Sequence, residues 1–80
     1  MPTIFRTRGF RLFFYSNEGQ PREPPHVHVE QREREAKFWL QPEVHLAYNE
    51  GFSARALRQL LMLIEANRER IEKAWDEFFG

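Results

Sequence analysis

The feature of this chain that most constrains its fold is a change in the spacing of its apolar residues at Ser53. Before Ser53, apolar and polar residues alternate in several short runs, which is the pattern of half-buried β-strands. After Ser53, apolar residues recur at intervals of three or four, as in an amphipathic helix, and serine is a preferred residue at a helix N-terminus. Strands followed by helix are typical of an α+β domain. We therefore predict an α+β fold with a small antiparallel sheet of roughly four or five strands, covered on one face by a C-terminal helix.

The expected strands lie within residues 1–50 and are separated by turn-forming residues. The runs that carry the strand pattern are Thr3–Thr7, Phe10–Ser16, His26–Gln31, Glu35–Leu40 and Glu43–Tyr48. Gly9 lies between the first two runs and predicts a bulge or a tight bend, so these runs form either one bent strand or a hairpin. Residues 17–25 contain three prolines and predict an irregular loop.

The helical pattern extends over residues 53–79, and its apolar stripe is interrupted at Asn67 and Arg68. A straight helix of this length would measure about 39 Å at ~1.5 Å per residue, which exceeds the diameter of so small a domain. We therefore predict a C-terminal helix that is long or broken near Asn67. Residues 1–80 are expected to form a single domain.

Composition excludes several classes of function. Twelve basic and twelve acidic residues cancel, so the chain lacks the charge of a strongly basic nucleic-acid binder. The absence of cysteine excludes a disulfide, a thiolate nucleophile and a thiolate zinc site. The N-terminal residues lack the apolar run of a signal peptide, and no segment approaches the ~20 apolar residues of a membrane span. We expect a cytoplasmic, soluble protein that needs no cofactor and contacts no membrane.

Strand alternation predicts which side chains lie on each face of the sheet. The apolar sets expected under the helix are Phe10, Leu12, Phe14, Val27, Val29, Ala36, Phe38, Leu40, Val44, Leu46 and Tyr48. The opposite or outer face is expected to carry aromatic, imidazole and cationic groups: Arg11, Phe13, Tyr15, His26, His28, Lys37, Trp39 and His45. A monomer seldom exposes so much aromatic area without a partner. The alternative is that the second helical segment or the long loop covers this face and makes it a minor core.

The segment Pro24–Val29 places His26 and His28 on the same side of a strand. Two such imidazoles can bind a metal ion, with His45 or Glu30 as a third ligand. The motif lacks a defined third ligand, so we assign no metal site. The alternative is that both imidazoles hydrogen-bond to the backbone, cap the loop or lie on the surface.

The same imidazoles are candidates for acid–base chemistry, because histidine titrates near neutral pH. Arg11, Tyr15 or Lys37 could stabilise a phosphate beside them, as in a metal-independent ribonuclease that uses 2′-hydroxyl attack. The candidate catalytic residues are His26, His28, Arg11 and Tyr15. RNA binding without catalysis would instead use stacking on the aromatic side chains of this face, and the zero net charge counts against it.

Protein binding requires the fewest assumptions. An open aromatic sheet face, an edge strand that can accept another strand and an amphipathic C-terminal segment are all surfaces for a partner. Arg55 and Arg58 lie near the helix start, where they oppose the helix dipole and could contact an acidic partner. The residues that we predict to form the binding face are Phe13, Tyr15, His26, His28, Lys37, Trp39, Arg58 and Trp75.

Over essentially its whole length, the chain resembles the small bacterial proteins of the domain-of-unknown-function 4160 family. The residues that carry this resemblance are Met1–Ile4, Phe13–Tyr15, Glu23–Val29, Glu35–Lys37, Ala56–Arg58, Ile64–Glu69 and Trp75. The resemblance implies a compact α+β protein that is often encoded beside a small protein of the domain-of-unknown-function 2442 type. Such pairs are sometimes labelled as toxin–antitoxin components, which implies a partner protein more firmly than a reaction.

These observations favour a small bacterial protein-interaction module that forms one component of a toxin–antitoxin-like pair. The expected partner is a small protein from a neighbouring gene, and a homodimer or RNA stay open as further partners. The alternative function is a metal-independent ribonuclease toxin that uses His26 and His28. The residues alone assign no enzyme activity.

Overall fold

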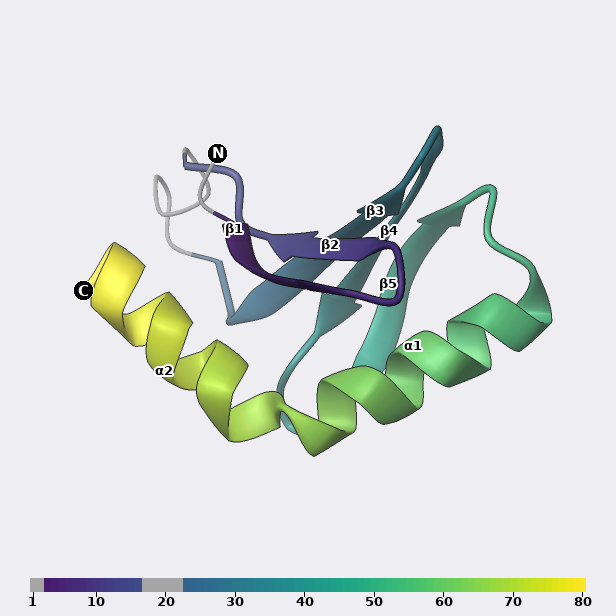
Figure 1. The fold of residues 1–80 in the computed structure, drawn as a ribbon. Helices are drawn as coiled ribbons and strands as arrows, with labels where there is room; N and C mark the ends of the chain where they lie inside the picture. The colour runs from purple at the N-terminus through teal and green to yellow at the C-terminus, as the bar shows by residue number, and fades with distance from the viewer. Residues whose placement is uncertain (1–2, 17–22) are drawn as a thin grey trace.

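The computed structural model describes residues 3–16 and 23–80, and within them the chain forms an antiparallel sheet followed by two helices (Figure 1). The elements are β1 (Thr3–Thr7), β2 (Phe10–Phe13), β3 (His26–Gln31), β4 (Arg34–Trp39), β5 (His45–Glu50), α1 (Ala54–Ala66) and α2 (Arg68–Phe79). The sheet has five strands in the order β1-β2-β3-β4-β5, so each strand pairs with its neighbour in sequence and β1 and β5 are the edges. The predicted α+β fold is confirmed.

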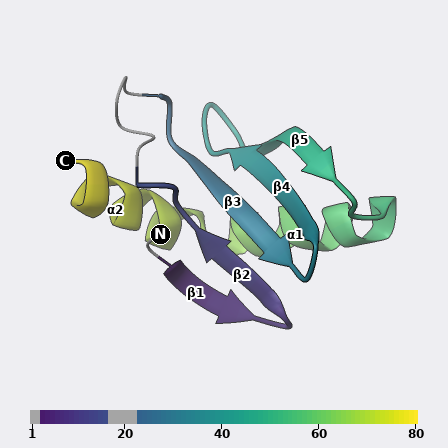
Figure 2. The ribbon, with the colours of Figure 1, turned by 90° about the horizontal axis from the view of Figure 1, so that it is seen from above.

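Both helices lie on one face of the sheet, as the two ribbon views show (Figure 1, Figure 2). The helical region breaks where the sequence predicts it, because Asn67 leaves helical geometry with φ −113° and ψ 16°. The Asn67 side chain donates a hydrogen bond to the carbonyl of Leu63 at 2.9 Å, which satisfies one of the last carbonyls of α1. The break lets the two helices follow a molecule whose longest dimension is 33 Å.

The core lies between the sheet and the helices. Its buried members from the strand region are Phe10, Leu12, Phe14, Val27, Val29, Ala36, Phe38, Leu40 and Val44. The helices contribute Leu60, Ile64, Ile71 and Trp75 to the same cluster. The apolar residues that alternate along the strands therefore pack against the apolar stripe of the helices, as expected. The two exceptions are Leu46 and Tyr48 in β5.

The segment around Gly9 forms a hairpin, which settles the choice between a bent strand and two strands. Arg8 and Gly9 occupy the turn with φ 52° and φ 83°. Two consecutive residues at positive φ are typical of the tight turns whose twist matches that of the paired strands. The second strand ends at Phe13 and is shorter than the run expected to reach Ser16.

A β-bulge in β5 changes the faces of this strand. Phe38 pairs with Leu46 but Lys37 pairs with Tyr48, so Ala47 is an extra residue between them. The bulge moves Tyr48 to the outer face, and the prediction that Tyr48 lies under the helix is wrong. Leu46 keeps the helix side, but its position on an edge strand leaves it 42% exposed.

Candidate functional site

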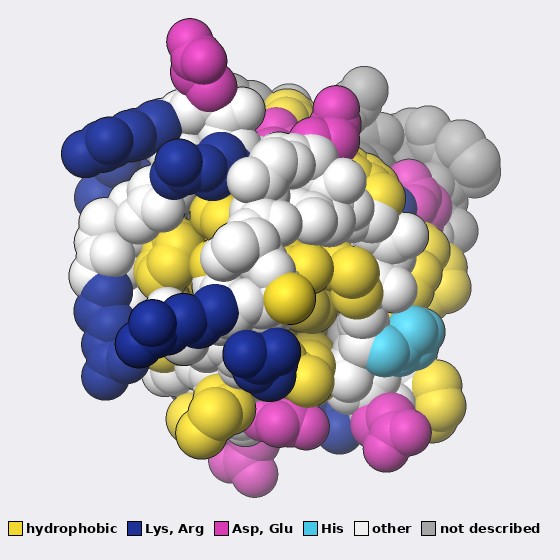
Figure 3. Space-filling model, turned by 90° about the vertical axis from the view of Figure 1, so that its right-hand side faces the viewer, with side chains coloured by type: hydrophobic (Ala, Val, Ile, Leu, Met, Phe, Trp, Pro, Cys, Tyr) yellow, Lys and Arg dark blue, Asp and Glu magenta, His cyan; other side chains and the backbone are white. Residues whose placement is uncertain are grey.

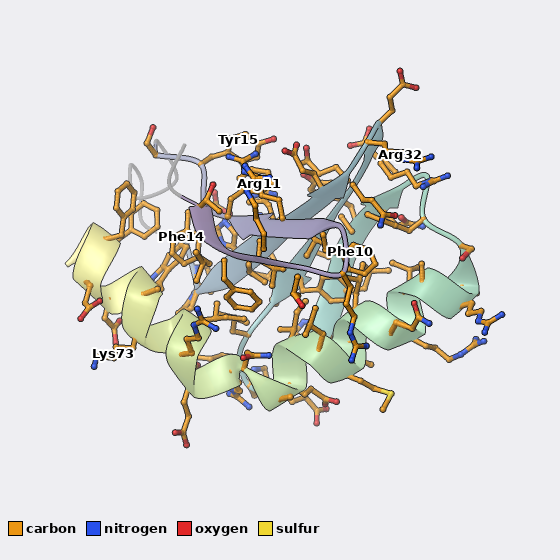
Figure 4. All side chains as sticks on the ribbon, viewed as in Figure 1. Phe10, Arg11, Phe14, Tyr15, Arg32 and Lys73 are labelled. Carbon is orange, nitrogen blue, oxygen red and sulfur yellow. The ribbon has the colours of Figure 1, made fainter. Side chains whose placement is uncertain are left out.

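The outer face brings together the aromatic residues that alternation assigns to it. Figure 4 shows Arg11 and Tyr15 on the side of the sheet away from the helices, and Phe10 and Phe14 on the side that faces them. The Phe13 ring is buried, with the Tyr15 ring at 5.0 Å and the Arg11 guanidinium 4.3 Å from its centroid. These side chains cover one another, so the face is a packed layer and not an open platform for stacking.

His26 is fully buried between two tryptophans. Its ring centroid lies 5.4 Å from that of Trp39 and 4.8 Å from that of Trp75. The Nδ1 atom lies 2.9 Å from the carbonyl oxygen of Pro24, and because a carbonyl only accepts, Nδ1 carries the hydrogen. Trp75 is itself only 2% exposed and contacts Phe14 edge-on, so it belongs to the core and not to an accessible binding face. Trp75 of α2 therefore contacts His26 at the start of β3, although both helices pack on the opposite face of the sheet (Figure 1, Figure 2).

His28 takes part in a cluster with one carboxylate and two phenols. Glu35 accepts hydrogen bonds from Tyr15 at 2.9 Å and from Tyr48 at 2.8 Å, one at each oxygen. The Nδ1 atom of His28 lies 3.4 Å from both the Glu35 carboxylate and the Tyr48 hydroxyl. Partial burial, the hydrogen bond to Glu35 and nearby negative charge raise the pKa of Tyr48 above its usual value, so this phenol stays a donor. The His28 side chain is 3% exposed, which leaves a substrate phosphate no access to it.

Sequence reasoning missed Glu35 and Tyr48 as members of this cluster. Alternation places Glu35 on the same face as Lys37, so strand periodicity could have found it. The position of Tyr48 depends on the bulge at Ala47, for which the sequence carries no local signal.

The cations of the outer face are already paired with carboxylates. Arg11 contacts Glu30 at 2.6 Å, and Lys37 contacts Glu23 at 3.0 Å. Lys37 also lies 4.2 Å above the Trp39 ring. A phosphate at this face would have to displace these ion pairs, so the arrangement gives little support to RNA binding or cleavage.

The third histidine lies apart from the other two. His45 is exposed at the edge of the sheet, and its Nδ1 atom lies 2.7 Å from the carbonyl oxygen of Glu43. Across residues 3–16 and 23–80, no group of three or more histidine, aspartate or glutamate side chains is arranged to hold a metal ion.

A groove runs between the edge strand β5 and helix α1. We call it the edge groove, and its lining residues are Phe38, Val44, His45, Leu46, Leu57, Arg58 and Leu61. Its volume is about 260 Å³, which matches one or two apolar side chains of a partner. All six residues of β5 are exposed, so the groove is accessible along its whole strand side.

Cationic side chains border the edge groove. Arg58 lines it, and Arg55 is exposed in the first turn of α1, where no acidic residue offsets its charge. Among the described residues, neither arginine forms an ion pair. Figure 3 shows the result on the face that holds the start of α1: yellow apolar side chains lie beside several dark blue Lys and Arg side chains. The surface therefore suits an apolar segment that carries negative charge.

Comparison with known proteins yields one finding. The model of a protein family described as a domain of unknown function (DUF4160) matches residues 9–76. No curated protein and no solved structure matches the chain. The matched range holds strands β2 to β5 and most of the helical region. It therefore includes the edge groove and the outer-face cluster of Tyr15, His28, Glu35 and Tyr48. None of the described helices is long and apolar enough to cross a membrane.

Proposed function

The chain belongs to the DUF4160 family, and we propose that it is a small protein-interaction module that binds its partner at the edge groove. The partner is a small protein encoded by a neighbouring gene, of the domain-of-unknown-function 2442 type, and the two form a toxin–antitoxin-like pair. The residues of the groove support the docking surface, and the family resemblance supports the identity of the partner.

The observation that carries this proposal is the exposure of Leu46 inside an apolar groove on an edge strand. Leu46 is 42% exposed although the groove holds Phe38, Val44 and Leu57 beside it. Full burial of a leucine side chain stabilises by about 1.5–3 kcal/mol, so covering the exposed part of Leu46 contributes about 1 kcal/mol to a complex. An edge strand with free backbone groups adds hydrogen-bonding capacity at the same place.

The proposed docking surface differs from the one that the sequence favours. The outer face is filled by its own aromatic rings and ion pairs, and Phe13, His26 and His28 are all buried. Of the residues predicted to form the binding face, Arg58 lies at the edge groove. The partner surface is therefore centred on β5 and α1.

The alternative of a ribonuclease toxin has weaker support from the geometry. Its two histidines are buried, and the cations expected at the phosphate are bound to Glu30 and Glu23. Buried imidazoles that contact aromatic rings and backbone are better explained by packing than by catalysis. RNA cleavage by the purified wild-type protein, lost in His28→Ala, would reverse this preference.

Co-expression with the neighbouring-gene protein tests the proposal. Leu46→Glu places a charge in the edge groove and is expected to abolish co-purification, because the complex would have to bury a carboxylate where it otherwise buries a leucine side chain. Met62→Glu is the matched control, since Met62 is 71% exposed on α1 and lies outside the groove. Both variants should melt within a few degrees of the wild type. Retention of the partner by Leu46→Glu would contradict the proposal.

A further inference from the structure

The two faces of the sheet at β5 carry charges of opposite sign. This asymmetry determines which side chains a β-strand added beside β5 can carry. By the register with β4, Tyr48 and Glu50 lie on the outer side of β5, and Leu46 lies on the helix side. The strand is an edge of the sheet, and all of its residues are exposed. A strand added beside β5 would therefore place alternate side chains against two different environments.

The outer side is acidic at the edge. Glu30, Glu35 and Glu50 lie directly opposite one another on β3, β4 and β5. Like charges in such positions destabilise a sheet unless partners offset them. Glu30 has Arg11, and Glu35 accepts hydrogen bonds from two tyrosines, but Glu50 has no ion-pair partner among the described residues. The row thus ends at the edge with a carboxylate that forms no ion pair within residues 3–16 and 23–80.

The helix side is cationic. Arg58 lines the edge groove, Arg55 precedes it by one turn, and the N-terminus of α1 adds the positive end of the helix dipole. Arg34 lies at the connection between β5 and α1, where it lines a further hollow with Gly51, Phe52 and Ser53. An apolar floor with a positive border therefore faces any side chain that points toward the helices.

We infer that the partner docks as an added β-strand of alternating charge, with Lys or Arg on its outer side and apolar and acidic residues on its helix side. This inference rests on the proposed function and specifies the chemistry of the partner. Cross-strand pairing sets each sign: a cation opposite Glu50, and leucine-like and acidic side chains toward the edge groove and Arg58.

A second copy of the chain fits this edge poorly. Two antiparallel β5 strands related by a two-fold axis normal to the sheet would form continuous faces, outer beside outer and helix side beside helix side. β5 contains no lysine or arginine to pair with Glu50 of the other copy, and it presents no acidic side chain toward the helix side. The edge instead complements a different chain whose charge pattern is the opposite of its own.

Two synthetic octapeptides test the inference by nuclear magnetic resonance titration of the full chain. The matched peptide, Lys-Leu-Lys-Leu-Lys-Glu-Lys-Glu, presents cations on one side and apolar and acidic residues on the other. The swapped peptide, Glu-Leu-Glu-Leu-Glu-Lys-Glu-Lys, keeps the apolar positions and reverses every charge. We expect the matched peptide to shift the amide signals of β5 and the first turn of α1, and to bind about tenfold more tightly than the swapped peptide. Its affinity should fall with added salt.

A charge-reversed variant removes the effect of overall peptide charge. The double substitution Glu50→Lys with Arg58→Glu leaves the net charge of the protein unchanged, and both positions are exposed. The variant should prefer the swapped peptide, whereas Glu65→Lys, an exposed position elsewhere on α1, should keep the wild-type preference.

The outcomes separate this inference from the proposed function. Equal binding of the two peptides at β5 would overturn the alternating charge pattern and leave the edge as the docking site. Absence of any shift in β5 with either peptide would overturn the added strand. The proposed function has its own test, which is whether the Leu46→Glu variant still co-purifies with the neighbouring-gene protein. Concentration-dependent dimerisation through β5 would overturn the choice of a different chain as partner.

Discussion

Substitution of His26 by alanine distinguishes a structural histidine from a functional one. His26 has no exposed surface, packs between Trp39 and Trp75, and lies within hydrogen-bond distance of the Pro24 carbonyl. If these contacts explain the residue, His26→Ala should destabilise the fold strongly and should leave the edge groove intact. If His26 instead has a catalytic role and little structural one, the substitution should cost little stability.

The expected magnitude follows from the burial of the ring. Truncation of a fully buried aromatic side chain to alanine costs about 3–5 kcal/mol, and imidazole is smaller and more polar than phenylalanine. A lost hydrogen bond of the Nδ1 atom adds about 1 kcal/mol. We therefore expect a loss of about 2–4 kcal/mol from a total free energy of unfolding of about 4–12 kcal/mol for a domain of this size.

Urea denaturation followed by tryptophan fluorescence measures this loss, because Trp39 and Trp75 flank the substituted position. With a slope near 1 kcal/mol per molar urea, the midpoint should fall by about 2–4 M, or the variant should be partly unfolded in buffer. His45→Ala, at an exposed histidine, should change stability by less than about 0.5 kcal/mol. A His26→Ala midpoint within roughly 0.5 M of the wild type, which corresponds to roughly 0.5 kcal/mol at this slope, would refute the packing argument.

Further substitutions test other parts of the structure. Because the pKa of Tyr48 is raised, the folded protein holds a proton that the unfolded chain loses near pH 10, so stability should decline above that pH. Tyr48→Phe should flatten this decline in a series of chemical denaturations, and an unchanged slope would argue against the raised pKa of Tyr48. The exposure of Tyr48 to solvent reduces the size of the effect. Ser53→Ala removes the side-chain acceptor for the Ala56 amide at 3.1 Å and should cost about 1 kcal/mol, whereas a neutral result would mean that water replaces the cap. Ile71→Ala should lower stability by about 2–5 kcal/mol, and a small loss would show that α2 is loosely packed.

Much of the fold follows from local patterns in the sequence. Alternation in the strand region identifies the residues that face the helices, and the helical spacing after Ser53 identifies the matching stripe. The break at Asn67 is predictable because a continuous helix would be too long for the domain and because the apolar stripe stops there. These features depend on neighbours in sequence, which is why they can be read without the structure.

The candidate site depended on contacts that local patterns do not contain. Alternation placed His26 and His28 on the same face, which the structure confirms, but burial of His26 requires α2 to bring Trp75 to the end of the sheet. The position of Tyr48 required the bulge at Ala47. Side chains that looked like an open surface in the sequence therefore pack against one another in the fold.

The edge groove was the least predictable surface. Leu46 has the periodicity of a core residue, and nothing in its own run of residues shows that no further strand lies beyond it. Its exposure follows from the strand order, which leaves β5 at an edge of the sheet. The arginines at the start of α1 are unfavourable for a helix N-terminus, which the sequence alone shows, and the structure places Arg58 beside Leu46 in one groove.

Amide hydrogen exchange of the chain with and without its neighbouring-gene protein tests the central claim most directly. If the partner docks at the edge groove, the amides of β5 should exchange at least tenfold more slowly in the complex, while those of the opposite edge strand β1 should keep their rates. Protection confined to β1 or to α2, with β5 unchanged, would contradict the edge groove as the binding surface.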